Sequence, residues 1–198
     1  MARPRTFDED RALDAAMRAF WANGYEATST QDLCAATGLG RSSIYNTFSS
    51  KHDLFKRALA RYIDLMTIPQ IALLEDPELP PAARIRALFE RIVDAEFALR
   101  PEGRSIGCLT VNTIVELAGR DPEAAAMVGR DQEIRLVALR GVLAAGQRSG
   151  EIASRRDPGD LARFLNAVIG GMRVAAQGGA DRAALEAVAA TALDALAP

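Results

Sequence analysis

The sequence predicts an all-α protein with about nine helices. Apolar residues recur three and four positions apart along most of the chain, which is the spacing of a helix with one buried face. Residues that cap helices, chiefly Ser, Thr, Asp and Gly, stand where these stretches begin and end, and no stretch alternates as a half-buried strand does. A length of 198 residues, 49% of them hydrophobic, is sufficient for a small domain followed by a larger one.

The first helix is expected to begin at Phe7 or Asp8, after a short basic arm over residues 1–6. Acidic residues at positions 8–10 favour this start because they face the positive end of the helix dipole. Asn23 and Gly24 end the helix, since glycine readily adopts the conformation that follows a last helical turn. The apolar stripe between these ends consists of Leu13, Ala16, Met17, Phe20 and Trp21.

The segment 28–54 predicts two short helices separated by a tight turn, followed by another capped helix. The N-cap of the first of them is Thr28 or Ser29. Gln31 or Asp32, three residues further on, can complete a capping box. Gly38 ends this helix, because the turn needs a left-handed conformation that costs energy for a residue with a side chain. With a further helix over about 40–48, the pattern is a helix-turn-helix, whose second helix enters the major groove of DNA.

The fourth helix begins after Ser49 or Ser50, and Pro69 is expected to weaken it although apolar residues continue to Leu74. Residues 76–81 form the clearest linker of the chain. The remaining helices are expected over 82–100, 108–118, 123–149, 158–177 and 181–196.

Composition and motifs argue against several other classes of protein. The two cysteines, Cys34 and Cys108, lie in no metal-binding motif, His52 is the only histidine, and no glycine-rich phosphate loop is present. We therefore expect no catalytic set, no metal and no cofactor. No apolar run approaches the roughly 20 residues of a membrane span, so we expect a cytoplasmic protein without a membrane partner.

The predicted helix-turn-helix divides into a packing face and a DNA face. Leu33, Leu39, Ile44 and Phe48 would pack the two helices together, and the outer face of the second would carry Arg41, Ser42, Ser43, Tyr45, Asn46 and Thr47. Arginine can read guanine and asparagine can read adenine through paired hydrogen bonds. Lys51 is placed to contact the phosphate backbone, and the helix N-terminus at Thr28, Ser29 and Thr30 favours a phosphate.

These residues carry a resemblance to the N-terminal domain of the TetR/AcrR family of bacterial transcriptional repressors, over about residues 7–60. The matching positions are Phe20, Gly24-Tyr25, Thr28-Ser29, Asp32-Leu33, Ala36, Gly38-Leu39, Ile44-Tyr45, Phe48, Ser50-Lys51 and Leu54-Phe55. The family usually has serine at the position of Gly40 and glycine at that of Ser42. More loosely, Gly107-Cys108-Leu109, Asn112, Glu116-Leu117 and Asp121-Pro122 resemble one branch of these regulators.

The resemblance implies a DNA-binding domain over 1–50 and a helical effector-binding and dimerisation domain over 51–198. It implies a homodimer on double-stranded, pseudo-palindromic operator DNA, released by a small-molecule effector of unknown identity. The implied ligand-binding residues are Tyr62, Met66, Phe89, Phe97, Cys108, Asn112, Glu116, Met127 and Arg135. The implied dimer interface comprises Leu161, Phe164, Val168, Gly171, Met172, Leu185, Val188, Ala189, Ala192 and Leu196.

Alternatives remain open at this point. The chain could be a helical ligand- or protein-binding module without operator binding, it could activate rather than repress, and Cys108 could sense electrophiles or oxidants instead of filling the core. Residues 1–51 hold six Lys or Arg and six Asp or Glu, so charge-driven binding must come from a small patch. That patch would comprise Arg3, Arg5, Arg41 and Lys51, which predicts a shallow dependence of DNA affinity on salt.

Overall fold

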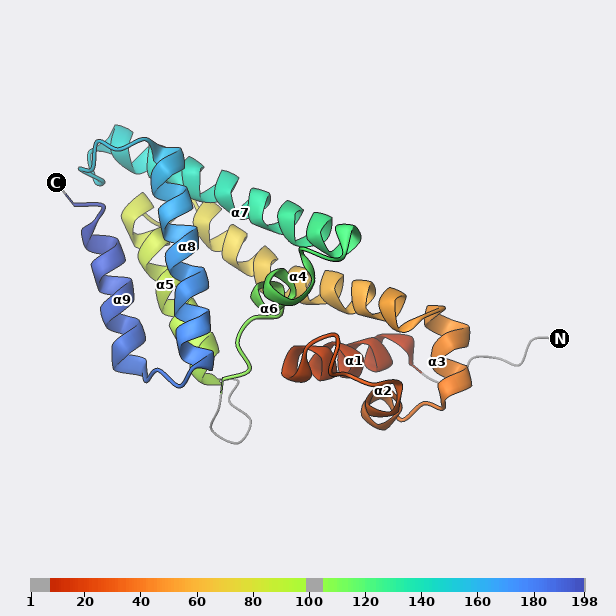
Figure 1. Ribbon diagram of the computed structural model, residues 1–198. Helices are drawn as coiled ribbons and strands as arrows, with labels where there is room; N and C mark the ends of the chain where they lie inside the picture. Colours follow the sequence, from red (N-terminus) through yellow and green to blue (C-terminus); the bar gives the residue numbers. More distant parts are fainter. Residues whose placement is uncertain (1–7, 99–104, 198) are drawn as a thin grey trace.

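The computed structural model describes residues 8–98 and 105–197, so the basic arm with Arg3 and Arg5 lies outside the described residues. Within the described ranges the chain forms nine α-helices and no strand, which confirms the predicted fold class (Figure 1). The helices are α1 (Glu9–Asn23), α2 (Thr30–Thr37), α3 (Arg41–Phe48), α4 (Lys51–Glu75), α5 (Pro81–Ala98), α6 (Leu109–Leu117), α7 (Pro122–Ser149), α8 (Pro158–Gln177) and α9 (Arg182–Asp194).

Helices α1 to α3 form a small bundle at one end of the molecule (Figure 1). Asp8 caps α1, and the capping box of α2 joins Ser29 to Asp32 through reciprocal side-chain and backbone hydrogen bonds. Gly38 adopts a left-handed conformation with φ of 71°, as the turn requires. Gly40 is the N-cap of α3 and supplies no side-chain hydrogen bond.

The long helix α4 connects this bundle with the rest of the chain (Figure 1). Ser50 caps it by accepting a hydrogen bond from the backbone of Asp53. Pro69 lies inside this helix but does not end it, and the helix continues to Glu75. Gln70 and Leu74 are both buried beyond the proline, and their packing outweighs the lost backbone hydrogen bond.

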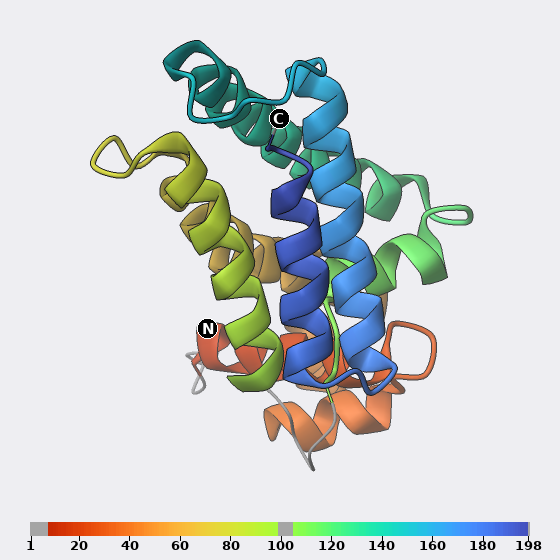
Figure 2. The same ribbon diagram turned by 90° about the vertical axis from the view of Figure 1, so that its left-hand side faces the viewer.

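Helices α5, α8 and α9 lie side by side at the end of the molecule opposite to α3, with α7 packed along α8 (Figures 1 and 2). Their core consists of buried aliphatic side chains, Phe89 and Met172. Ile85, Leu139, Leu165 and Leu185 have no exposed surface at all. Most of the apolar residues of α8 and α9 are thus covered within one chain, whereas Phe164 and Val188 stay exposed.

A second core joins the N-terminal bundle to α4, α6 and α7. Phe20 of α1 packs edge to face against Phe55 of α4, with ring centroids 5.2 Å apart. The indole Nε1 of Trp21 donates a 2.9 Å hydrogen bond to the carbonyl of Gly107, just before α6. Among the described helices, none combines the length and apolar character needed to cross a membrane.

Candidate DNA-binding surface and ligand cavity

Helix α3 presents a polar face to solvent. Its inner side is anchored by Ile44 and Phe48, which are 1% and 2% exposed. Three of the six expected contact residues on α3 are exposed: Arg41, Ser42 and Asn46. The other three are half-buried: Ser43, Tyr45 and Thr47. This arrangement leaves an arginine and an asparagine free to meet base edges from one short helix.

Two of the contact residues are already joined across the helix-turn-helix. The hydroxyls of Tyr45 and Thr30 lie 2.9 Å apart and link α3 to the start of α2. The guanidinium of Arg41 lies 5.7 Å from the centre of the Tyr45 ring. These contacts orient Arg41 and Tyr45 before any DNA is bound.

The N-terminus of α2 corrects one expectation. Thr28 is fully buried, and its hydroxyl donates a 2.6 Å hydrogen bond to the carbonyl of Gly24, so it cannot reach a phosphate. Ser29 is exposed, but its hydroxyl and backbone amide both bond to Asp32. The hydrogen bonds from Ser29 lower the pKa of the Asp32 carboxyl.

Lys51 lies beside the loop between α1 and α2. Its Nζ is 4.5 Å from the centre of the Tyr25 ring and 3.4 Å from the carbonyl oxygen of Glu26. The ammonium group is therefore held close to the N-terminal end of α4, on the side of that loop.

The even balance of charges in the N-terminal segment changes once α4 is included. Glu9 pairs with Arg57 at 2.5 Å, and Asp14 pairs with Arg61 at 3.0 Å. Both arginines lie beyond residue 51, on α4. The acidic residues of α1 are therefore partly neutralised at the α1–α4 contact, away from Arg41.

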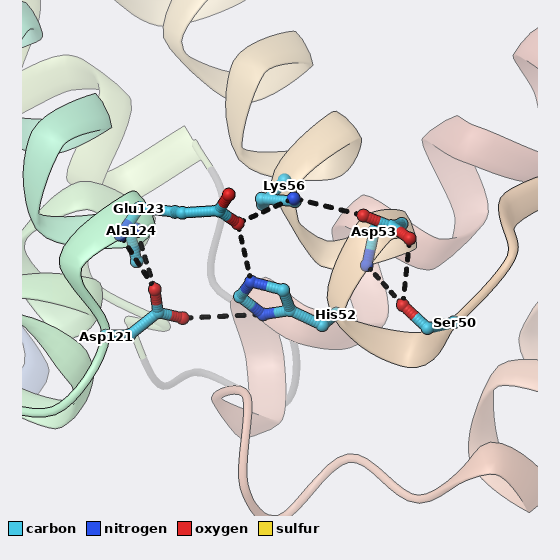
Figure 3. Close-up of polar contacts among 7 residues, drawn as sticks. All are labelled: Ser50, His52, Asp53, Lys56, Asp121, Glu123 and Ala124. Carbon is cyan, nitrogen blue, oxygen red and sulfur yellow. Dashed lines mark hydrogen bonds and ion pairs between the residues drawn. The ribbon is translucent and has the colours of Figure 1, made fainter.

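A cluster of charged side chains connects the start of α4 with the start of α7 (Figure 3). His52 lies 3.4 Å from Asp121 and 3.2 Å from Glu123. Lys56 bridges Glu123 at 2.7 Å and Asp53 at 3.0 Å. Hydrogen bonds from Lys56 are the main reason why the pKa values of Glu123 and Asp53 are lowered.

A cavity of about 550 Å³ opens between α1, α4, α5 and α8. Tyr62 and Met66, expected as ligand-binding residues, line it. None of the other lining residues was expected from the sequence to bind a ligand, among them Trp21, Gln70, Leu73, Glu96 and Arg173. The volume falls within the range of about 300–1,000 Å³ that is typical of small-molecule sites.

The other seven expected ligand-binding residues lie outside the lining of this cavity. Glu116 accepts hydrogen bonds of 2.9 and 2.7 Å from the backbone amides of Tyr25 and Glu26, because α6 packs against the α1–α2 loop. Arg135 is paired with Asp131 in a buried contact of α7. Phe89 and Cys108 fill the two cores, Phe97 lies beneath Arg182, Asn112 bonds to the carbonyl of Ile106, and Met127 packs against the second core.

A buried ion pair forms the polar wall of the cavity. Arg173 of α8 donates a 2.9 Å hydrogen bond to Glu96 of α5, and Ser105 donates one of 2.6 Å to the other carboxylate oxygen. A signal for this pair exists in the sequence, since both residues interrupt apolar stripes. Arg173 follows Ile169 and Met172 at helical spacing, and Glu96 likewise follows Phe89, Ile92 and Val93.

The thiol of Cys108 is buried next to this wall, 3.0 Å from the Thr110 hydroxyl. Burial alone would raise its pKa, but the positive charge of Arg173 and hydrogen bonds from Thr110 and Tyr62 outweigh burial and lower it. Burial also raises the pKa of the Tyr62 hydroxyl. The side chain of Cys108 is only 3% exposed, so the protein itself restricts access to the sulfur.

The expected dimer residues divide into two groups. Six of them are buried inside the protomer: Leu161, Met172, Leu185, Ala189, Ala192 and Leu196. This corrects the interface, because their apolar area is already covered by neighbouring helices. Phe164 of α8 and Val188 of α9 remain 42% and 44% exposed, and both line one apolar groove together with Val168. Gly171 of α8 is also exposed.

Comparisons with known proteins agree with this geometry. Residues 12–58 match the model of the tetR family of bacterial regulatory proteins, and residues 81–192 match a tetracyclin repressor-like C-terminal domain. The chain is 34% identical to the HTH-type transcriptional repressor ComR of Escherichia coli (strain K12) over 191 residues, covering 96% of this chain and 90% of that protein. It is 33% identical to the uncharacterized HTH-type transcriptional regulator YezE of Bacillus subtilis (strain 168), covering 84% of each chain.

A solved structure of the TetR family transcriptional regulator CifR is similar throughout its length. That protein, a cysteine mutant complexed with 26-bp double-strand operator DNA, superimposes with a TM-score of 0.82 at 29% identity. The match covers 98% of this chain and 99% of that one. The two family models and the three proteins named here are all described as transcriptional regulators or repressors.

Proposed function

Since this chain belongs to the tetR family of bacterial regulatory proteins, we propose that it is a repressor that binds its operator as a homodimer and is released by a small-molecule effector. The observation that carries the proposal is the exposed face of α3, where Arg41, Ser42 and Asn46 stand free while Ile44 and Phe48 are buried. The proposed DNA-binding domain spans residues 1–50 and the effector-binding and dimerisation domain 51–198. The start of α4 at Lys51 supports this division, and operator binding implies action in the cytoplasm.

In the proposed complex α3 lies in the major groove. Arg41 reads a guanine and Asn46 an adenine, while the hydroxyls of α3 and Lys51 contact phosphates. Ser29 and Thr30 bring the N-terminus of α2 to the phosphate backbone. The hydroxyl-bearing residues of α3 in this assignment are Ser42, Ser43, Tyr45 and Thr47.

The proposed dimer forms through α8 and α9. Phe164, Val168 and Val188 supply an apolar groove on the outer face of these two helices. A twofold axis through this face repeats the same groove on the partner. Two copies of α3 then read half-sites separated by about 34–36 Å, one DNA turn, or a multiple of it, so the operator is a pseudo-palindrome.

The cavity supplies a route from effector to DNA. Trp21 of α1 and Tyr62 of α4 both line it, so a ligand there contacts the DNA-binding domain directly. The α1–α2 loop is in turn held by Glu116 of α6. Release requires only that the effector prefer the arrangement that does not bind DNA, with a coupling of about 1–3 kcal/mol.

A salt series tests the proposal. Fluorescence anisotropy would follow binding of the protein to labelled duplexes that tile the region upstream of its own gene, with excess random DNA present. We expect one duplex to bind despite the competitor, with affinity falling as salt rises, because phosphate contacts release counterions. Binding to no duplex, or binding abolished by random DNA, would reject operator recognition and leave a helical binding module.

A further inference from the structure

We propose that the effector is an uncharged aromatic molecule carrying a hydroxyl group, which binds in the cavity between α1, α4, α5 and α8. That the bound molecule acts as an effector rests on the proposed function, whereas its chemical class is argued from the cavity alone. The cavity has an aromatic wall, two buried polar atoms without partners, and no surplus positive charge to attract an anion.

The aromatic wall is formed by Trp21 and Tyr62, whose ring centroids lie 4.8 Å apart at an interplanar angle of 77°. The polar atoms of both rings are already used, since Trp21 bonds to Gly107 and the Tyr62 hydroxyl to Cys108. Met66 adds a polarisable thioether to the lining. Such a wall favours a ring over a flexible chain, because aromatic pairs and sulfur–aromatic contacts stabilise beyond their buried area.

The two unpartnered atoms lie on residues that line the same cavity. Gln70 is 5% exposed, and its Oε1 has no hydrogen-bond partner. Arg173 is 6% exposed, and its Nε–H likewise has none. A buried polar atom left unpaired costs about 1–3 kcal/mol, so a ligand that pairs both gains this free energy on binding. Gln70 needs a donor and Arg173 an acceptor, and a hydroxyl group supplies both.

The charges of the lining argue against a carboxylate as the polar group. The positive charge of Arg173 is already matched by Glu96, whose two oxygens bond to Arg173 and Ser105. The remaining charged residues of the lining are Glu90, Arg91 and Asp94, and Asp94 is already paired with Arg182 at 2.9 Å. An anion would enter a site without surplus positive charge, and a cation would find no free carboxylate oxygen on Glu96.

Three bicyclic probes separate these requirements on the unaltered protein. 2-Naphthol donates and accepts, 2-methoxynaphthalene only accepts, and 2-naphthoate carries a negative charge. Isothermal titration calorimetry should show 2-naphthol binding one site per protomer, with each of the other two bound about tenfold more weakly or worse. Equal or tighter binding of either of the other two, or absence of 2-naphthol binding, would overturn the proposal.

Two variants test whether the preference for 2-naphthol depends on a hydrogen bond to Gln70. Gln70→Met keeps the volume and removes the acceptor, so 2-naphthol and 2-methoxynaphthalene should bind this variant equally. Gln132→Met changes an exposed glutamine of α7 and should preserve the preference of the unaltered protein. A preference that survives in a folded Gln70→Met would also overturn the assignment, and the probe series on the unaltered protein decides the matter should that variant not fold.

Operator binding is measured on the same preparation without any probe. Loss of the probe preference together with intact operator binding would reject only the ligand class. Intact probe preference without operator binding would reject only the proposed repressor function.

Discussion

The carboxylate of Glu116 accepts a 2.9 Å hydrogen bond from the backbone amide of Tyr25, across 91 positions of the chain. Its other oxygen accepts a 2.7 Å hydrogen bond from the backbone amide of Glu26. Glu116 of α6 therefore binds two successive amides of the loop that precedes the helix-turn-helix. Gly24 stands directly beneath, and a Cβ there would come within 2.9 Å of the same carboxylate. Glu116 thus joins α6 to the α1–α2 loop, beside the hydrogen bond from Trp21 to Gly107 that connects α1 with the segment before α6.

Replacing Glu116 by alanine should weaken the contact between α6 and the α1–α2 loop. The two amides lose their acceptor, and we expect the free energy of unfolding to fall by about 1–3 kcal/mol, measured by urea denaturation. Glu133→Ala, at an exposed position of α7, is the matched control and should change stability by less than about 0.5 kcal/mol. A Glu116→Ala protein as stable as that control would show that the contact contributes nothing.

The charged cluster around Lys56 predicts that the stability of the folded protein depends on pH. The pKa values of Glu123 and Asp53 are lowered in the folded protein, so both carboxylates stabilise it above their ordinary pKa values. This contribution is lost as the pH falls below about 4 and the carboxylates become protonated. The difference in denaturation midpoint between the unaltered protein and Lys56→Met should therefore be present at pH 7 and shrink towards pH 3.

The control for this series is Arg163→Met, which removes an exposed pair within α8. Its effect on the midpoint should be smaller than that of Lys56→Met at pH 7, because it connects no separate helices. An effect of Lys56→Met that stays constant down to pH 3 would contradict the proposed charge linkage.

Local signals predicted much of the fold. The sequence offered Thr28 or Ser29 as the cap of α2 and Gln31 or Asp32 as its partner, and the structure has Ser29 with Asp32. The left-handed turn at Gly38 depends on neighbours a few positions apart, so the sequence reveals it directly. The same holds for the exposed face of α3, which follows from the buried Ile44 and Phe48 at helical spacing.

The cavity and the dimer face depend instead on how distant helices meet. Periodicity places an apolar stripe on α9 but does not say whether another helix of the same chain or a partner covers it, and Leu185 proves to be internal. Gln70 lies beyond a proline in α4, and only the approach of α5 and α8 brings it into a cavity. Arg173 and Glu96 were detectable as charges on apolar stripes, but their pairing required the fold.

The dimer face can be tested by introducing charge. Phe164→Glu combined with Val188→Glu places two carboxylates in the apolar groove, where an unpaired charge is costly to bury. We expect the dimer dissociation constant from sedimentation equilibrium to rise at least about tenfold, with operator affinity falling in parallel. Ile68→Glu, at an exposed position of α4, should leave the dimer intact. An unchanged dissociation constant in the double variant would place the interface elsewhere.

The most direct test of the account is the ratio of affinities for the operator and for a scrambled duplex of equal length, measured at one salt concentration. The unaltered protein should prefer the operator by about a thousandfold or more, and Arg41→Ala combined with Asn46→Ala should remove most of that preference. Arg148→Ala, at the exposed end of α7, should leave the ratio unchanged. Equal affinity for both duplexes, or a preference that survives loss of both α3 side chains, would contradict DNA recognition by α3.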